Sequence, residues 1–175
     1  MWTKETKVVI LTGAGISAES GIRTFRASDG LWEEHRIEDV ATPMGWERNP
    51  QLVWDFYQAR RNQLFEVEPN PGHLALTTLE EYLDEMLLVT QNVDNLHDRA
   101  GSKNLIHIHG ELEKLRCEEC DYVGIMMDEH DLTSSFVSCP ECSNAVMRPH
   151  IVWFHEMPMR MSEIERALNQ CDVFI

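Results

Sequence analysis

The sequence has no apolar run long enough to cross a bilayer and no excess of basic residues. A membrane-spanning helix needs about 20 consecutive apolar residues, and segments such as 8–11 in this 175-residue chain fall well short of that. Fifteen Lys and Arg stand against thirty Asp and Glu, for a formal net charge of −15. Nucleic-acid phosphates require basic side chains. We therefore expect no membrane and no nucleic-acid partner, and we interpret the acidic surplus as a solubility margin.

The sequence shows no internal repeat and no low-complexity segment, and we expect no secretory signal at its start. Residues 1–7 are polar, and the apolar residues that follow run directly into a glycine-rich turn, which indicates a core strand. We therefore expect a cytoplasmic protein, in which thiols stay reduced and disulfides are rare. Hydrophobic residues make up 43% of the chain, enough for one ordinary domain or for a large and a small module.

Short β-branched segments alternate with helical patterns along the chain. This alternation predicts an α/β fold with a Rossmann-like parallel sheet and helices on both faces. Strands are expected at residues 7–12, 86–90, 104–109 and 172–175, a short strand or loop at 151–154, and helices at 50–65, 71–84 and 161–169. Residues 110–150 differ, because they are acidic, show little helical periodicity and carry four of the five cysteines. We predict a Rossmann-like domain from residues 1–110 and 151–175, and a small metal-binding domain from residues 111–150.

The four cysteines form two C-x-x-C pairs, Cys117 with Cys120 and Cys139 with Cys142, separated by eighteen residues. This spacing is typical of a zinc ribbon, in which two knuckles supply four thiolates to a tetrahedral ion. All four positions are filled by protein ligands, so the predicted zinc is structural. Disulfides or a redox-active C-x-x-C are the alternatives, which reduced thiols and two matched pairs disfavour. Cys171 stands apart and is predicted to be a small core residue.

A glycine-rich loop, Gly13-Ala14-Gly15-Ile16-Ser17-Ala18, follows the first predicted strand. Its pattern matches the dinucleotide fingerprint G-x-G-x-x-G/A, in which the backbone approaches a pyrophosphate at a helix N-terminus. The acidic second strand of ordinary Rossmann dehydrogenases does not follow. Aromatic and cationic residues follow instead, at 21–32, and they indicate either a lid over a cofactor or a surface loop.

Polar residues also follow the next two predicted strands. Residues 90–95 (TQNVDN) come after one strand and residues 107–111 (HIHGE) after the other. Ligands bind at the carboxyl ends of strands in open α/β sheets, although an Asx-rich turn would explain the first segment equally well. His107 and His109 are two residues apart, so a strand would place them on one face. Imidazole suits proton transfer near neutral pH.

These motifs together resemble the sirtuin family of NAD-dependent protein-lysine deacylases. The matching blocks are GAGIS (13–17), GIRTFR (21–26), TQNVDNLH (90–97), HIHGE (107–111), the cysteine pairs and VWFHEMP (152–158), in family order. The resemblance implies a large Rossmann-like domain and a small zinc domain, with NAD and acylated lysine of a protein substrate meeting between them. It implies transfer of the acyl group to ADP-ribose with release of nicotinamide, His109 being the general base. It also implies one structural zinc ion, held by the four cysteines.

The resemblance assigns further roles residue by residue. The implied cofactor-binding residues are Gly13, Ala14, Gly15, Ile16, Ser17, Thr24, Phe25, Arg26, Trp32, Gln91, Asn92, Val93 and Asp94. Of these, the glycine-rich loop and Ser17 would contact phosphates, and Asp94 the nicotinamide carboxamide. Val152, Trp153 and Phe154 would pair with the extended peptide substrate as an added strand.

Helical spacing in residues 50–65 places an arginine on an apolar face, and the resemblance then implies which acyl groups are removed. Val53, Tyr57, Arg60 and Leu64 share one face, so Arg60 lies on an otherwise apolar stripe while Arg61 points elsewhere. A guanidinium there needs an anionic partner. The Tyr57-x-x-Arg60 pair and Thr24 resemble the sirtuin subgroup that removes succinyl and malonyl groups, in which this pair binds the acyl carboxylate. The alternative is an arginine that reaches solvent or pairs with an acid such as Asp55.

Two features depart from the family pattern. Sirtuins continue beyond a strand equivalent to residues 172–175, so the chain is expected to be truncated at its C-terminus, and His155 occupies a position where the family often has glycine. The competing hypotheses are mono-ADP-ribosyl transfer by a similar site, or an inactive fragment acting as a zinc-ribbon binding module.

Overall fold

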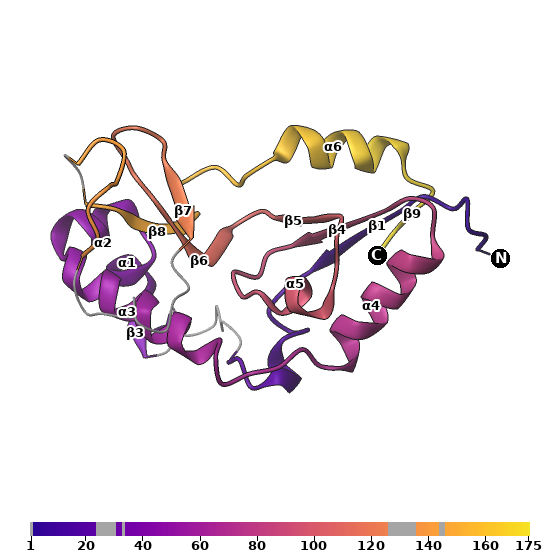
Figure 1. The fold of residues 1–175 in the computed structure, drawn as a ribbon, viewed down its shortest axis with the longest axis horizontal. Coiled ribbons are helices and arrows are strands. Elements are labelled where there is room, and N and C mark those ends of the chain that lie inside the picture. The colour runs from indigo at the N-terminus through magenta and orange to yellow at the C-terminus, as the bar shows by residue number, and fades with distance from the viewer. Residues whose placement is uncertain (1, 24–30, 33, 126–135, 144–145) are drawn as a thin grey trace. The chain divides into compact units, whose positions relative to one another are not determined.

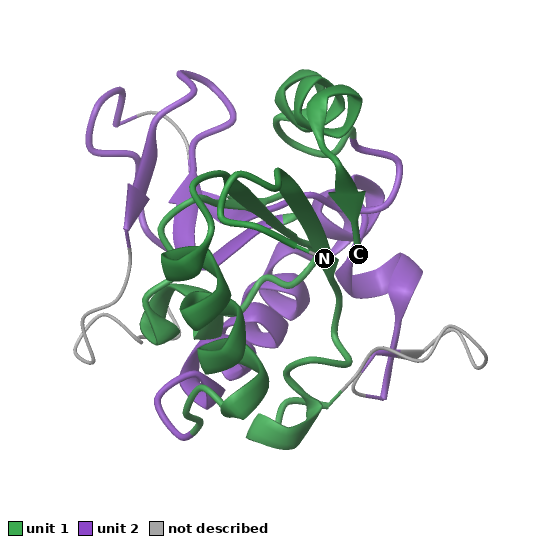
Figure 2. Cartoon of the chain, turned by 90° about the vertical axis from the view of Figure 1, so that its right-hand side faces the viewer, with its two compact units in different colours: residues 1–24, 67–109, 157–175 green, residues 25–66, 110–156 purple. Residues whose placement is uncertain are grey.

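The computed structural model describes residues 2–23, 31–32, 34–125, 136–143 and 146–175 (Figure 1). Thr24, Phe25 and Arg26, three of the expected cofactor residues, lie outside the described part of the chain. The chain divides into two compact units, coloured separately in Figure 2. Unit 1 comprises residues 1–24, 67–109 and 157–175, and unit 2 comprises residues 25–66 and 110–156.

Unit 1 contains the predicted Rossmann-like arrangement. Its elements are β1 (Val8–Thr12), the 3-10 helix η1 (Ala18–Ser20), α4 (Pro71–Tyr82), β4 (Met86–Thr90), α5 (Leu96–Ala100), β5 (Leu105–His107), α6 (Met161–Gln170) and β9 (Val173–Phe174). The strands form one sheet in the order β5-β4-β1-β9, with every pair parallel. The expected strand at 104–109 ends at His107, and the four strands predicted for this sheet are confirmed.

The sheet of unit 1 is covered by a helix on each face, as expected (Figure 1). Val8 and Ile10 of β1 pack with Leu76 and Leu79 of α4 on one face. Val9, between them, packs in a second cluster with Ile164 of α6 on the other face. Successive side chains of a strand point to opposite faces, so a strand buried on both faces needs the continuous apolar run that β1 and β4 have.

Unit 2 combines a three-stranded antiparallel sheet with a group of helices. Its elements are β2 (Leu31–Trp32), β3 (His35–Arg36), α1 (Ile37–Val40), α2 (Pro43–Arg48), α3 (Pro50–Gln63), β6 (Gly110–Arg116), β7 (Val123–Ile125) and β8 (Arg148–Ile151). The larger sheet has the order β7-β6-β8, and β2 pairs with β3. The segment expected at 151–154 thus begins as the end of β8 and continues as an irregular turn.

The division differs from the expected domains, because residues 25–66 belong with the cysteine segment. The reason lies in one apolar cluster, in which Trp54 of α3 packs with Leu115, Cys117, Cys139 and Met147. Trp54 is fully buried. The cysteine segment has few large apolar residues of its own, so the helical segment supplies the rest of its core.

Helix α3 is buried along two faces, and Arg61 lies on the second of them, away from the predicted face. Val53 and Tyr57 are buried as predicted, but Arg61 is 0% exposed whereas Arg60 is only partly buried. Arg61 lies seven residues after Trp54, on a second buried stripe. Its Nε donates to the carbonyl oxygen of Leu112 at 2.6 Å, and burial lowers the pKa of Arg61 to about 10. Spacing located the first stripe but gave no sign that a polar stripe would also be enclosed.

Every helix in the described residues is too short or too polar to cross a lipid bilayer. This agrees with the absence of a long apolar run in the sequence.

Gly110 is the residue at which β6 begins, and it has no tolerance for a side chain. Its φ is +83°, a conformation that costs L-residues about 1–2 kcal/mol. A Cβ built there would overlap the carbonyl oxygen of His150 in the neighbouring strand β8. We predict that Gly110→Ala lowers the unfolding free energy by more than about 2 kcal/mol, measured by urea denaturation. Gly15→Ala is the matched control, since a Cβ at Gly15 meets nothing within 4 Å. Equal stability of the Gly110 variant and the wild type would contradict the prediction.

Candidate active site and metal centre

Three strand ends form a row at one edge of the parallel sheet in unit 1. The register pairs Thr12 of β1 with Thr90 of β4, and Thr90 with His107 of β5. The segments that follow these three strands are the glycine-rich loop, residues 91–94 and residues 108–109. Parallel pairing therefore brings the three predicted motifs to the same edge, where open α/β sheets bind ligands.

The glycine-rich loop is hydrogen-bonded to the N-terminus of α4. Asn70, the N-cap of that helix, donates from Nδ2 to the carbonyl oxygen of Ile16 at 2.7 Å and to Ser20 Oγ at 3.0 Å. The Oδ1 atom of Asn70 accepts from the backbone N–H of Gly72. The loop itself stays open, because Gly15 is exposed and a Cβ there would meet nothing within 4 Å. An uncovered loop backbone of this kind has room for a phosphate group.

Ser17 is the centre of a buried polar network beneath that loop. Its hydroxyl donates to Asp94 Oδ2 at 2.9 Å and accepts from Asn92 Nδ2 at 3.0 Å. His73 Nε2 lies 3.4 Å from the same oxygen. Ser17 and His73 are 0% exposed, and Asn92 and Asp94 are each 6% exposed. The Ser17 side chain thus links three segments of unit 1, and its contact with a phosphate stays a prediction.

Two buried histidines lie side by side under the site. The rings of His73 and His97 are 4.8 Å apart in an edge-to-face arrangement. Burial lowers the pKa of His73, although Asp94 opposes the shift. Burial and the neighbouring histidines lower the pKa of His97 to about 4. Both rings are therefore neutral at pH 7, and His97 Nε2 lies 3.0 Å from Thr12 Oγ1 at the end of β1.

His107 and His109 bind successive backbone carbonyl groups. His107 Nδ1 lies 3.1 Å from the oxygen of Asn92, and His109 Nδ1 lies 3.0 Å from the oxygen of Gln91. A carbonyl oxygen only accepts, so Nδ1 of His109 carries a proton. The unprotonated nitrogen of a neutral His109 is then Nε2, which is the geometry of a general base.

The expected substrate segment of unit 2 is a tight turn after β8. Trp153 N donates to Glu156 Oε2 at 2.8 Å, and Glu156 N donates to the carbonyl oxygen of Trp153 at 3.0 Å. His155, inside the turn, has a φ of 76°. The Trp153 ring is 2% exposed and faces the interior, whereas Phe154 is 49% exposed and Val152 is partly buried. The side chains of Val152 and Phe154 are therefore at least partly accessible, whereas the Trp153 side chain is not.

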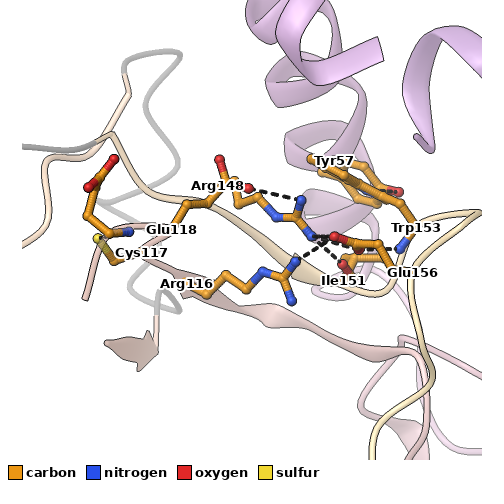
Figure 3. A network of polar contacts seen from close by, with 9 residues as sticks. Tyr57, Arg116, Cys117, Glu118, Arg148, Ile151, Trp153 and Glu156 are labelled. Carbon is orange, nitrogen blue, oxygen red and sulfur yellow. Dashed lines mark hydrogen bonds and ion pairs between the residues drawn. The ribbon is translucent and has the colours of Figure 1, made fainter. Parts of the chain in front are cut away.

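The inner side of this turn is fixed by a network of charged and aromatic groups, shown in Figure 3. Arg148 binds both carboxylate oxygens of Glu156 at 2.8 Å, and its guanidinium lies 3.7 Å from the Trp153 ring centre. Burial would raise the pKa of Glu156, but hydrogen bonds from Arg148 and Trp153 outweigh it and hold the pKa below its usual range.

The two residues of the expected acyl-specificity pair differ in their surroundings. Tyr57 is 0% exposed, and its hydroxyl accepts a hydrogen bond from Trp153 Nε1 at 3.0 Å. Burial raises the pKa of Tyr57, so the phenol is neutral and keeps its proton for donation. Arg60 stacks on Phe56, with its guanidinium carbon 3.8 Å from the ring centre, and donates to the carbonyl oxygen of Phe56 at 2.8 Å. Asp55, the acid proposed as an alternative partner, accepts a hydrogen bond from Gln51.

Trp32 was expected to contact the cofactor. In unit 2 its ring packs edge-on against Phe56 at 5.0 Å and Tyr57 at 6.0 Å. It therefore belongs to the aromatic cluster around α3, and it remains partly exposed.

The four predicted cysteines converge. Their sulfur atoms all lie within 4.8 Å of one another, with Cys117 and Cys142 3.8 Å apart and Cys120 and Cys139 3.5 Å apart. A tetrahedral zinc ion with Zn–S bonds of about 2.3 Å places its sulfurs about 3.8 Å apart. Burial acts to raise the pKa of Cys139, but hydrogen bonds from the N–H groups of Cys142 and Glu141 lower it to about 7. The cluster thus has the spacing that a four-thiolate zinc site requires.

Several residues that build the site were not predicted. Asn70 and His73 hold the loop and Ser17 from α4, and Arg148 and Glu156 hold the substrate turn. The Asn70-Pro71 pair does signal a helix start, so Asn70 could have been identified as a cap. Its second bond, to Ile16, depends on a sequence separation of 54 residues, and local patterns do not indicate such contacts.

Comparison with known proteins agrees with the geometry. Residues 13–175 match the model of the Sir2 family. NAD-dependent protein deacylases of Pasteurella multocida (strain Pm70) and Salmonella typhimurium are 57% and 58% identical to this chain over 181 and 177 residues, which cover 99% and 97% of it. The chain therefore belongs to the Sir2 family. It spans 74% of the length of the first relative and 62% of the second.

Solved structures show the same likeness. A Sir2 homologue mutant in complex with ADP-ribose matches 98% of this chain and 69% of its own, with a TM-score of 0.86 and 39% identity. A Sir2 homologue in complex with NAD matches 98% of this chain and 67% of its own, with a TM-score of 0.82 and 39% identity. The predicted family and fold class are confirmed.

The cysteine cluster yields a prediction about metal content. Cys139→Ser should remove zinc binding and loosen unit 2, because the buried Cys139 packs with Trp54 in the apolar cluster. We expect about one zinc ion per wild-type chain by colorimetric assay after denaturation, and much less in the variant, with a red shift of tryptophan fluorescence. Cys171→Ser is the control, since Cys171 is outside the cluster and should keep full zinc content. Wild-type fluorescence from a Cys139 variant verified to be free of metal would contradict the prediction.

Proposed function

We propose that this protein is an NAD-dependent protein-lysine deacylase. The observation that carries the proposal is the arrangement of His109, Gln91, Asn92, Asp94 and the glycine-rich loop at one edge of the sheet in unit 1. The names of its Sir2 relatives support this activity. The substrates are acylated lysine side chains of proteins, and the products are free lysine, nicotinamide and acylated ADP-ribose. The reduced four-cysteine site supports a cytoplasmic location.

Residues of unit 1 would hold the cofactor. The open backbone at Gly13, Ala14, Gly15 and Ile16 suits the phosphates. Gln91 and Val93, which are not buried, stand with Asn92 and Asp94 beside the row of strand ends. When bound, NAD supplies the electrophilic ribose carbon and the acceptor of the acyl group.

His109 would move the proton. Nδ1–H is held by the Gln91 carbonyl oxygen, so the ring is oriented and Nε2 would be free to accept a proton from a ribose hydroxyl of bound NAD. The neutral His73 and the Ser17 network hold Asn92 and Asp94 without adding charge. The zinc ion takes no part in the chemistry, because four thiolates leave it no open position.

Residues of unit 2 would hold the acyl-lysine peptide. Val152 and Phe154 would offer an edge to the extended peptide. Tyr57 and Arg60 would bind the carboxylate of a succinyl or malonyl chain. The neutral Tyr57 hydroxyl accepts from Trp153, so its own proton is available for an acceptor, and the guanidinium of Arg60 supplies charge.

The role of His109 is tested by substitution. His109→Asn keeps a donor for the Gln91 carbonyl but has no basic nitrogen, so kcat should fall by about 10²- to 10⁴-fold. The measurement is nicotinamide release from NAD with an acetyl-lysine peptide. His107→Asn is the matched control at the other histidine and should retain far more activity. Nicotinamide release unaffected by the His109 change would refute the assignment, and labelled NAD that leaves ADP-ribose on protein would indicate mono-ADP-ribosyl transfer instead.

Acyl preference is tested at Arg60. Arg60→Met removes the charge but keeps the apolar stem over Phe56, so kcat/KM for a succinyl-lysine peptide should fall by about 10- to 100-fold. Turnover of the acetyl-lysine peptide should change by less than about threefold and serves as the internal control. Arg60→Lys should give an intermediate result, since a lysine keeps the charge but loses the planar fork. A Met variant that still removes succinyl groups at the wild-type rate would rule out this role.

A further inference from the structure

Arg148 and Glu156 form the most deeply enclosed ion pair among the described residues whose purpose the proposed chemistry leaves open. Arg148 is 1% exposed at its side chain, and Glu156 is 22% exposed. Removing two charges from water costs free energy, and the attraction between them often does no more than offset that cost. Two apolar residues of similar size would stabilise the fold equally well. Stability alone therefore does not explain why an ion pair is buried here, and its contacts must be considered.

The pair closes around the turn formed by residues 151–156, as Figure 3 shows. Besides both oxygens of Glu156, Arg148 Nη2 binds the carbonyl oxygen of Ile151 at 3.1 Å. Glu156 in turn accepts from the backbone N–H of Trp153. Both ends of the turn are therefore fixed to one guanidinium, directly at Ile151 and through Glu156 at Trp153.

The backbone inside the turn is strained. His155 has a φ of 76°, a region that residues other than glycine seldom adopt. Such conformations persist where the surroundings fix them. The two hydrogen bonds between Trp153 and Glu156 bracket His155 and supply that constraint.

The same pair fixes the Trp153 ring. Arg148 lies against the ring face at 3.7 Å, and the ring Nε1 donates to Tyr57 Oη at 3.0 Å. The ring is thus held at its face and at its edge, while Phe154 on one side of Trp153 is exposed and Val152 on the other is partly exposed. The ion pair therefore holds the backbone around Trp153, together with the hydrogen bond that Phe154 N donates to the carbonyl oxygen of Ala41 at 3.0 Å.

We propose that Arg148 and Glu156 are positioning residues that hold the segment 151–156 in its peptide-binding conformation. The inference rests on the proposed function, in that Val152 and Phe154 face the acyl-lysine peptide. It adds that the affinity for the peptide backbone depends on this pair, whatever acyl group the lysine carries. Arg116 also binds Glu156, at 2.8 Å, and Glu118 binds Arg148, at 3.2 Å, whereas Arg148 and Glu156 themselves bind the backbone of the turn, at Ile151 and Trp153.

The test combines two ways of removing the pair. Glu156→Gln keeps the size of the side chain but loses its charge. The double variant Arg148→Met with Glu156→Leu removes both charges, so no unpaired charge stays buried. Arg116→Met is the control, since it leaves the Arg148–Glu156 pair and both ends of the turn intact. Binding of a fluorescently labelled acyl-lysine peptide is measured by polarisation, with thermal midpoint, zinc content and the KM values for peptide and NAD.

We expect the peptide Kd and KM to rise at least about tenfold in both variants, the equivalent of one charge-assisted hydrogen bond. The KM for NAD, the zinc content and the thermal midpoint of the double variant should stay near wild type. The loss should be equal for acetyl- and succinyl-lysine peptides, in contrast to the acyl-dependent loss expected at Arg60.

Three outcomes would overturn the inference. The first is wild-type peptide affinity in a folded double variant. The second is loss of folding in both variants, which would make the pair a stability element. The third is a wild-type protein that does not bind the peptide. A wild-type protein that binds peptide but releases no nicotinamide would instead contradict the proposed function, while the binding measurements would still test the role of the pair.

Discussion

The lateral register of three parallel strands is the constraint on which the rest of unit 1 depends. Thr12, Thr90 and His107 end their strands in one row, because β1, β4 and β5 pair without a slip. Each strand end delivers a loop to the same edge of the sheet. A shift of one residue would turn the buried side chains of β4 to the opposite faces, so the packing of both faces fixes the positions of the site residues.

Near that edge of the sheet, buried polar groups form hydrogen bonds with one another. Ser17 donates to Asp94 and accepts from Asn92, and Asn70 binds the carbonyl oxygen of Ile16. Buried polar groups without partners cost about 1–3 kcal/mol each, so this network has few alternative arrangements. The network holds the exposed parts of the loop and of residues 91–93 in a defined geometry. The histidines beneath it, His73 and His97, are neutral because burial lowers their pKa.

In unit 2 the constraint is different, because the cysteine segment has few apolar residues with which to form a core. Small domains seldom bury enough apolar surface to fold without help. Here the cysteine segment shares a cluster with Trp54 of α3 and gains a four-thiolate site. The helix that stabilises the cysteines is the same helix that carries Tyr57 and Arg60, so the metal site and the proposed acyl-binding residues belong to one folding unit.

The sequence by itself determined the elements whose signals are local. Continuous apolar runs predicted the strands of the parallel sheet, helical spacing predicted α3, α4 and α6, and C-x-x-C spacing predicted the cysteine cluster. The order of short motifs predicted the family and the set of candidate residues. Each strand, helix and motif depends on residues within a few positions of one another, so it can be found from periodicity and spacing, and the order of the motifs can then be read along the chain.

Only the tertiary structure decided which of these residues are exposed and which are buried as supports for others. It placed residues 25–66 with the cysteine segment, buried Arg61 beside Leu112, turned the Trp153 ring inward, and made Ser17 a link between Asp94 and Asn92. It also revealed Asn70, His73, Arg148 and Glu156 as supporting residues. The partners in most of these contacts are 50 or more residues apart, and the Arg148–Glu156 pair forms only because β8 and the turn after it bring the two together. Burial and hydrogen bonding at such distances follow from packing, which local sequence patterns do not encode.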